Sequence, residues 1–179
     1  MLFSSLIFLF FFLPLLIAVY YILPKKFRNY ILLLFSLIFY AWGGVSYTII
    51  LIVSVAINYF FVKQLEQNTK QKKKWLIFGL IFNILVIVIF KYLDFIIENI
   101  NVIGGFCINN FIEFPLKHIV LPLGISFFTF QQISLLWDVY RNEYSQKATF
   151  SNIALYISLF PQLIAGPIVR YDDIIDQIK

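Results

Sequence analysis

The sequence predicts an all-α, polytopic membrane protein with about five to six transmembrane or re-entrant helices. Hydrophobic residues make up 61% of the 179-residue chain, charged residues only 13%, and long uncharged stretches alternate with short basic runs. A soluble domain would be about half apolar and about one quarter charged. Such an apolar chain must expose hydrophobic side chains to lipid, so the lipid bilayer is its expected partner. Residues 1–179 are predicted to contain no separate soluble domain.

The uncharged stretches set the predicted helices. Leu2–Leu23 carries no charge, and a membrane-spanning helix needs about 20 residues. It lacks a basic start and a small-residue cleavage site, so we expect an uncleaved helix rather than a signal peptide. Residues 29–62 are too long for one crossing, and Gly43–Gly44 divides them into helices at about 29–42 and 46–63. Three more apolar segments follow, at Trp75–Leu93, His118–Trp137 and Ala148–Val169, with a mixed connection at Asp94–Lys117.

Basic residues predict the direction of these segments. The connection after the first helix contains Lys25, Lys26 and Arg28, and the connection after the third contains Lys63, Lys70, Lys72, Lys73 and Lys74. The Gly43–Gly44 turn has no charge, and Asp94–Lys117 has Lys117 as its only basic residue. Basic connections remain in the cytoplasm. We therefore expect a multi-pass protein of a bacterial cytoplasmic (inner) membrane with its N-terminus outside.

Several classes of function are disfavoured. Cys107 is the only cysteine, so no disulfide framework or multi-cysteine metal site is predicted. The net charge of +5 comes from short runs between hydrophobic segments, which is typical of membrane topology and not of nucleic-acid binding. His118 is the only histidine, and no partner that could orient it as a general base lies nearby in sequence. No catalytic residue and no metal site is predicted.

Polar side chains within membrane segments are costly and mark contacts or cavities. Asn58, in the third helix, is expected to bond to a neighbouring helix. Gln131, Ser134 and Asp138 are spaced i, i+3, i+7, which places them on one helical face. Asp138 and Arg141 are also three apart and can form an ion pair. This face forms either a buried packing network, which spacing alone favours, or the lining of a substrate path.

The stretch "LFPQLIAGPIVRYDD", Leu159–Asp173, interrupts the last apolar segment. Pro161 and Pro167 lack an N–H and disfavour helical geometry before them, and Gly166 has no side chain. Non-helical backbone at membrane depth must be buried in protein or line water. We therefore expect a broken or re-entrant segment, with Gln162 and Arg170 beside a polar cavity.

Two long motifs carry a family resemblance. "LPLGISFFTFQQISLLWDVYR" and "LFPQLIAGPIVRYDDI", together with "INYFF" and "FKYLDF", resemble the membrane-bound O-acyltransferases, in the bacterial alginate O-acetyltransferase branch. The resemblance covers essentially the whole chain. It implies a ring of helices around a funnel. It also implies an acyl donor, acetyl-coenzyme A or a carrier thioester, and an acceptor hydroxyl on a partner protein or polysaccharide outside. The candidate funnel residues are Gln131, Ser134, Asp138, Arg141, Gln162 and Arg170.

The family's catalytic-histidine motif, roughly "RRWHxSLSxWLRDY", has no counterpart here, and His118 does not match it. The chain is therefore expected to be the N-terminal part of such an enzyme, with an incomplete helical ring, inactive without the C-terminal half. The acetylated polymer, for example alginate or peptidoglycan, is left open. The alternative is a non-enzymatic membrane scaffold or a small transporter subunit.

Overall fold

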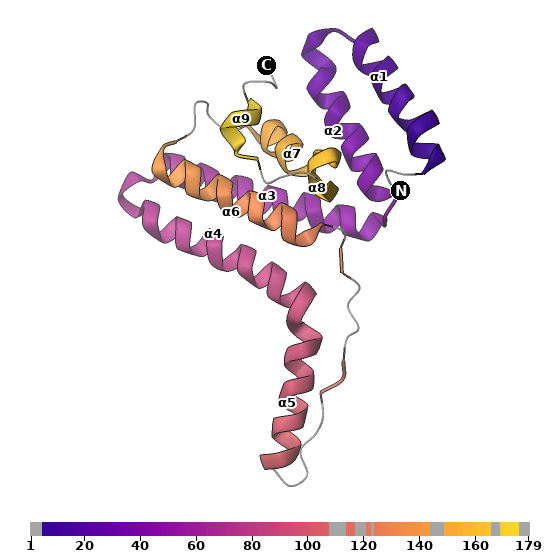
Figure 1. Ribbon diagram of the computed structural model, residues 1–179. Helices are drawn as coiled ribbons and strands as arrows, with labels where there is room; N and C mark the ends of the chain where they lie inside the picture. Colours follow the sequence, from indigo (N-terminus) through magenta and orange to yellow (C-terminus); the bar gives the residue numbers. More distant parts are fainter. Residues whose placement is uncertain are drawn as a thin grey trace.

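The computed structural model describes residues 5–107, 114–116, 121–122, 124–143, 149–165 and 169–175. Over this part of the chain the structure contains helices and no strand, as the composition predicts (Figure 1). The helices are η1 (Phe8–Phe12), α1 (Leu13–Ile22), α2 (Lys25–Ala41), α3 (Val45–Gln67), η2 (Thr69–Gln71), α4 (Lys72–Ile87), η3 (Val88–Tyr92), α5 (Leu93–Cys107), α6 (Ile125–Arg141), α7 (Phe150–Ser158), α8 (Phe160–Ala165) and α9 (Tyr171–Ile175).

The first predicted helix is present as η1 followed directly by α1. A π-helical turn, Phe8–Phe12, precedes Pro14 within the same continuous helix, and such local π adjustments accommodate the missing N–H of a proline. This helix packs against α2 through a cluster of aromatic rings. Phe8, Phe12 and Phe39 are buried there together with Phe160 from α8. This cluster therefore joins the first helix of the described chain to α8, near its other end.

The glycine pair produces the tight turn that the sequence predicts. α2 ends at Ala41 and α3 begins at Val45, so the uncharged stretch is two helices. Gly44 has φ +146°, a value that L side chains rarely adopt. A Cβ atom at Gly44 would also lie 2.7 Å from Cδ2 of Tyr47. Both helices extend beyond their predicted bounds into the charged flanks.

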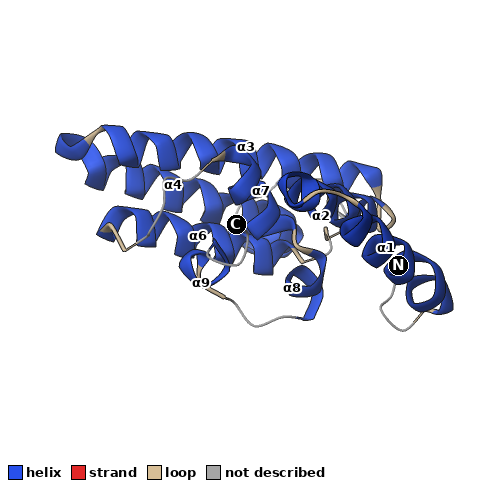
Figure 2. Cartoon of the chain, turned by 90° about the horizontal axis from the view of Figure 1, so that it is seen from above, coloured by secondary structure: helices blue, strands red, loops and turns tan. Residues whose placement is uncertain are grey.

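The centre of the molecule is formed by α3, α4 and α6, which pack side by side, while α7 packs on α2 and α3 (Figures 1 and 2). Leu51, Phe128 and Leu135 are among the buried side chains of this core. α4 approaches α6 closely at Gly79, where a Cβ atom would lie 2.7 Å from Cδ1 of Leu136. Small residues at such crossings allow close helix packing in membrane proteins.

The expected connection at Asp94–Lys117 is wrong in its first half. The helix that begins at Lys72 continues through the π-helical turn η3 into α5 and ends at Cys107. Asp94, Glu98 and Asn101 are spaced four and three residues apart, which suits one face of a helix and explains why their polarity does not end it. Gly104 and Gly105 lie inside α5 as well. The helix bends near η3, and α5 leaves the bundle (Figure 1).

The last predicted segment is broken, but earlier than either proline. α7 ends at Ser158, Leu159 has ψ 110°, and α8 begins at Phe160. Pro161 occupies the first turn of α8, where its missing N–H costs no hydrogen bond and where the preceding helix has already ended. Gly166 and Pro167 lie outside the described residues.

Two helices of the described chain are long and apolar enough to cross a membrane. They are α3 and the continuous helix Lys72–Gly105. Phe8–Ile22 is a shorter apolar helix. These helices suit a membrane protein. The count of five to six membrane segments and the incomplete ring remain predictions.

Candidate functional site

The two long motifs meet through a pair of glutamines. Gln131 lies in α6 and is 2% exposed, and Gln162 lies half-buried in α8. The side-chain Nε2 of Gln131 donates a hydrogen bond to Oε1 of Gln162 over 3.4 Å. α8 also packs on α6 and α7. The break at Leu159 therefore turns Gln162 towards the polar face of α6.

A charged group follows about two turns further along the same face of α6. Asp138 is buried, and Arg170, just before α9, is the charged residue with the strongest electrostatic effect on it. Arg170 itself is exposed. The segment that carries it is held by Tyr156 of α7, whose hydroxyl donates a 2.8 Å hydrogen bond to the carbonyl oxygen of Val169. The ring of Tyr156 also packs edge-on against Tyr171, with centroids 5.4 Å apart.

Of the remaining candidate residues, Arg141 lies differently from what its spacing suggests. Ser134 is half-buried on α6, between Gln131 and Asp138. Arg141 is exposed and forms its ion pair with Glu143, at 2.8 Å, rather than with Asp138. α6 ends at Arg141, so the side chain can turn to the residue beyond the helix instead of back along it. Pro161 is exposed on α8.

A second set of buried polar side chains joins α3, α4 and α6. Asn58 and Asn83 exchange two hydrogen bonds, of 3.2 and 2.7 Å, which confirms the expected contact of Asn58 with a neighbouring helix. One turn earlier in α3, the hydroxyl of Ser54 donates to Oε1 of Gln132 over 2.9 Å. Asn58 also donates to the backbone carbonyl of Ser54 over 3.0 Å, so the two contacts are linked.

The role of Gln132 and Asn83 was not predicted. Both are polar residues within apolar stretches, which is the signal that identified Asn58. Gln132 lies next to Gln131 in sequence, but consecutive residues point to different faces of a helix. The adjacent glutamines therefore reach in two directions: Gln132 bonds to α3 and Gln131 bonds to α8.

Two atoms of this glutamine pair lack partners among the described residues. They are Oε1 of Gln131 and Nε2 of Gln132. Buried polar atoms are normally hydrogen-bonded to protein, water or ligand. Gln131 presents one acceptor and Gln132 one donor that a further group can satisfy.

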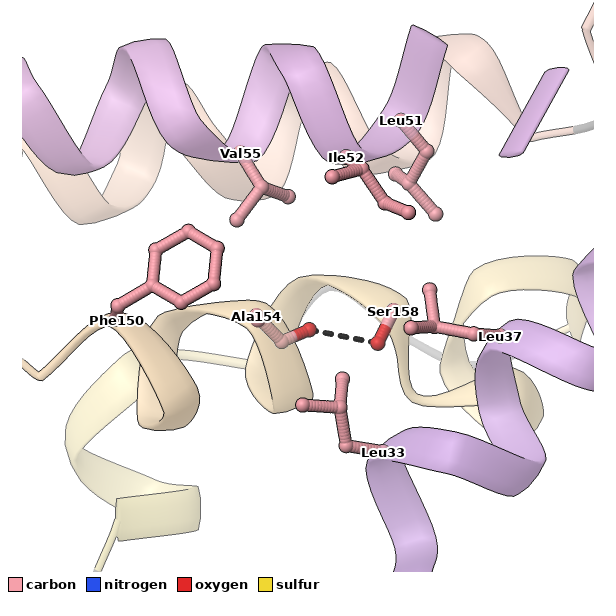
Figure 3. Close-up of a pocket in the computed structure, with 8 residues that line it drawn as sticks. All are labelled: Leu33, Leu37, Leu51, Ile52, Val55, Phe150, Ala154 and Ser158. Carbon is pink, nitrogen blue, oxygen red and sulfur yellow. Dashed lines mark hydrogen bonds between the residues drawn. The ribbon is translucent and has the colours of Figure 1, made fainter. Parts of the chain in front are cut away.

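A small apolar cavity of about 90 Å³ lies elsewhere, between α2, α3 and α7 (Figure 3). Its walls are Leu33, Leu37, Leu51, Ile52, Val55, Phe150, Ala154 and Ser158. Ser158 contributes the one hydroxyl of this lining, and it donates to the carbonyl oxygen of Ala154 over 2.6 Å. With its polar group already bonded, this cavity offers packing space and no reactive atom.

The described residues contain no cluster of His, Cys, Asp and Glu that could hold a metal ion. His118 lies outside the described residues. The chemistry available at the α6–α8 contact is therefore hydrogen bonding by amides together with the charges of Asp138 and Arg170. Such groups can position and polarise a substrate.

Comparison with known proteins matches the whole chain to two kinds of O-acetylating protein. It is 37% identical to the probable alginate O-acetylase AlgI of Pseudomonas aeruginosa and 36% identical to that of Azotobacter vinelandii, with the full chain covered in both matches. It is also 37% identical, again over its full length, to the peptidoglycan O-acetyltransferase of Helicobacter pylori. No family model and no solved structure matches the chain.

These matches relate the chain to membrane-bound O-acyltransferases. The chain spans only 35% of the length of the P. aeruginosa protein, 36% of the A. vinelandii protein and 39% of the H. pylori protein. It corresponds to an N-terminal part of O-acetyltransferases of the alginate O-acetylase and peptidoglycan O-acetyltransferase type.

Proposed function

We propose that this chain forms the N-terminal part of a bacterial membrane O-acyltransferase that acetylates a cell-surface or exported polysaccharide. The observation that carries the proposal is the similarity of the whole chain, at 36–37% identity, to part of proteins named for the acetylation of alginate and of peptidoglycan. The arrangement of the motifs supports it. The α6 motif and the α8–α9 motif, which α7 separates in sequence, pack together with polar side chains at their contact.

In this proposal Gln131, Ser134, Asp138, Gln162 and Arg170 border the path along which the acyl group moves. Transfer breaks the bond between the acyl carbon and the donor's sulfur and forms a bond to the acceptor oxygen, whose proton passes to a base. Negative charge develops on the carbonyl oxygen, and amide N–H groups and guanidinium groups stabilise such charge. The guanidinium of Arg170 suits this role. In this proposal the base is supplied by the part of the enzyme that corresponds to the uncovered length of the relatives.

The proposed location is the bacterial cytoplasmic membrane, with the N-terminus outside. The donor, acetyl-coenzyme A or a carrier-bound thioester, would be supplied from the cytoplasm, and the acceptor would be a polysaccharide or a partner protein outside. The apolar helices α3 and Lys72–Gly105 support the membrane location. The basic run at Lys70–Lys74 supports a cytoplasmic position for the turn between them.

A chimera tests the proposal directly. The chain replaces the corresponding N-terminal part of the P. aeruginosa protein or of the H. pylori protein, and acetyl groups on alginate or on peptidoglycan are measured in cells lacking the native gene. The proposal expects acetylation above the level of the deletion strain in at least one chimera, and none with the chain alone. The unaltered relative, expressed from the same vector, controls for expression.

If both chimeras reach the membrane at the level of the unaltered relatives and neither acetylates its polymer, the proposal fails. The alternative, a non-enzymatic scaffold or a transporter subunit, would then be favoured, since broken helices also occur in transporters. Acetylation in one chimera alone would identify the acceptor class that the N-terminal part tolerates.

A further inference from the structure

The helix that begins at Lys72 is too long to lie within a bilayer. The apolar helix Lys72–Gly105 has 34 residues, which is about 50 Å at about 1.5 Å per residue. The hydrocarbon core of a membrane is about 30 Å thick. A straight crossing would therefore leave about 20 Å of helix outside. In the structure the helix does not run straight, because it bends near η3 and α5 departs from the bundle (Figure 1).

Charged and aromatic residues place the end of the crossing at this bend. From Trp75 to Tyr92 the helix rises about 26 Å, close to the thickness of the hydrocarbon. Lys72, Lys73 and Lys74 precede this section. Lys91 and Tyr92 end it in η3, with the ammonium group of Lys91 5.4 Å from the ring centre of Tyr92. Lysine and tyrosine are typical of membrane–water interfaces. α5 therefore begins where the bilayer core ends.

The surface of α5 is divided into two faces. Phe95, Ile96, Ile100, Val102 and Ile103 are all exposed, with exposed fractions of 62% for Val102 and Ile103. Asp94, Glu98 and Asn101 lie on the side of the helix opposite Ile96, Ile100 and Ile103, while Phe95 and Val102 lie at the boundary between the two faces. Asn99 falls within the apolar face, but its amide donates to the carbonyl oxygen of Phe95 in the same helix over 2.7 Å.

The returning chain is attached to the polar face. The amide of Asn101 donates to the carbonyl oxygen of Phe114 and accepts from the backbone N–H of Phe114, both over 2.8 Å. This pair of bonds anchors residue 114 on the side of α5 opposite Ile103. The apolar face is left uncovered by the described residues.

We propose that α5 lies in the membrane–water interface, with Ile96, Ile100 and Ile103 among the acyl chains and Glu98 towards water. A helix with one apolar and one polar face suits this position. Lipid is the occupant that the geometry favours, because the apolar face begins at the edge of the bilayer and belongs to the same continuous helix as the apolar span. The only ionised groups of α5, Asp94 and Glu98, are acidic. Its contact with lipid therefore rests on apolar burial and does not require anionic lipids.

Site-directed fluorescence tests this inference independently of acetyl transfer. The full chain carries Cys107→Ser and one new cysteine, at Ile103, Glu98 or Ile84, labelled with an environment-sensitive fluorophore in phosphatidylcholine vesicles. We expect blue-shifted emission at position 103, quenched more by a lipid spin label near the headgroup than by one near the acyl-chain end. Position 98 should emit as in water and be quenched by iodide. Position 84, on the exposed side of α4, is the matched control and should be quenched more by the deep label.

Each other pattern overturns the proposal. Water-like emission at both 98 and 103 would place α5 away from the bilayer. Deep quenching at both would make α5 a transmembrane segment. Blue-shifted emission at 103 without quenching by either lipid label would show that protein, for example a second copy of the chain, covers the face. Adding phosphatidylglycerol to the vesicles should leave the emission at 103 unchanged, and a shift that depends on it would contradict the apolar mode of contact.

Discussion

Asn58 of α3 and Asn83 of α4 form a reciprocal side-chain pair, with each amide donating to the other over 3.2 and 2.7 Å. Both residues are completely buried. Each amide also donates to a backbone carbonyl of its own helix, that of Ser54 for Asn58 and that of Gly79 for Asn83. This arrangement fixes the orientation of both amides and joins the two longest apolar helices of the described chain.

Removing one member of this pair should destabilise the bundle. Asn83→Ala leaves the amide of Asn58 with an unsatisfied buried acceptor, and we expect a loss of about 1–3 kcal/mol in the free energy of unfolding. The double variant with Asn58→Ala should cost less than the sum of the two single variants, by about 0.6–1.7 kcal/mol. Unfolding in detergent micelles, followed by circular dichroism, measures the cycle. Asn99→Ala is the control, because Asn99 is exposed and bonds only within α5. Simple additivity of Asn58→Ala and Asn83→Ala would mean that the pair contributes no coupling.

Two glycines within helices should respond in opposite directions to alanine. At Gly79 a Cβ atom would lie 2.7 Å from Cδ1 of the fully buried Leu136, so Gly79→Ala forces α4 and α6 apart. Overpacking of this kind costs about 1–3 kcal/mol. At Gly105 a Cβ atom meets nothing within 4 Å, and Gly105→Ala should stabilise α5 by about 0.5–1 kcal/mol. The same unfolding assay compares both variants, and equal effects would argue against a close crossing at Gly79.

The two arginines near Asp138 provide a matched test of the candidate site. Arg170 has the strongest electrostatic effect on Asp138, whereas Arg141 pairs with Glu143 at the end of α6. In an active chimera, Arg170→Gln should lower the rate of acetylation by at least about tenfold, since lost stabilisation of developing charge costs about 2.7–4 kcal/mol in the strongest cases. Arg141→Gln should leave the rate within about twofold, because exposed ion pairs contribute little.

The measurement is acetyl release from the purified polymer at equal amounts of membrane-bound chimera. Equal losses for Arg170→Gln and Arg141→Gln would remove the distinction between the two positions and, with it, the assignment of Arg170 to the path. Gln131→Leu extends the test to the α6–α8 contact. It should reduce the rate without preventing insertion, since Oε1 of the half-buried Gln162, which loses its donor, can accept from water instead.

Much of the fold could be predicted from hydrophobic stretches and glycines, because these act locally. Gly44 ends one helix and begins another through its own backbone geometry. The continuation of α4 into α5 was not predicted. The polarity of Asp94, Glu98 and Asn101 suggests a connection between helices, whereas their spacing of four and three residues indicates one face of a helix. The sequence predicts that Gln162 lies beside a polar cavity, but it does not predict the hydrogen bond between Gln131 and Gln162. It depends on where α7 ends, and Leu159 ends it before either proline.

The direction of the chain in the membrane can be tested with single cysteines. In a Cys107→Ser background, cysteines at Ser5, Lys70 and Glu98 are treated in intact cells with a maleimide that does not cross membranes. The excess of lysine at Lys70–Lys74 should hold that turn in the cytoplasm, so Lys70→Cys should react only after lysis. Ser5→Cys and Glu98→Cys, on the other side, should react in intact cells. Lysed cells provide the control for reactivity of each thiol. The reverse pattern would place the N-terminus in the cytoplasm, and labelling of Lys70→Cys together with Glu98→Cys in intact cells would mean that Trp75–Tyr92 does not cross the membrane.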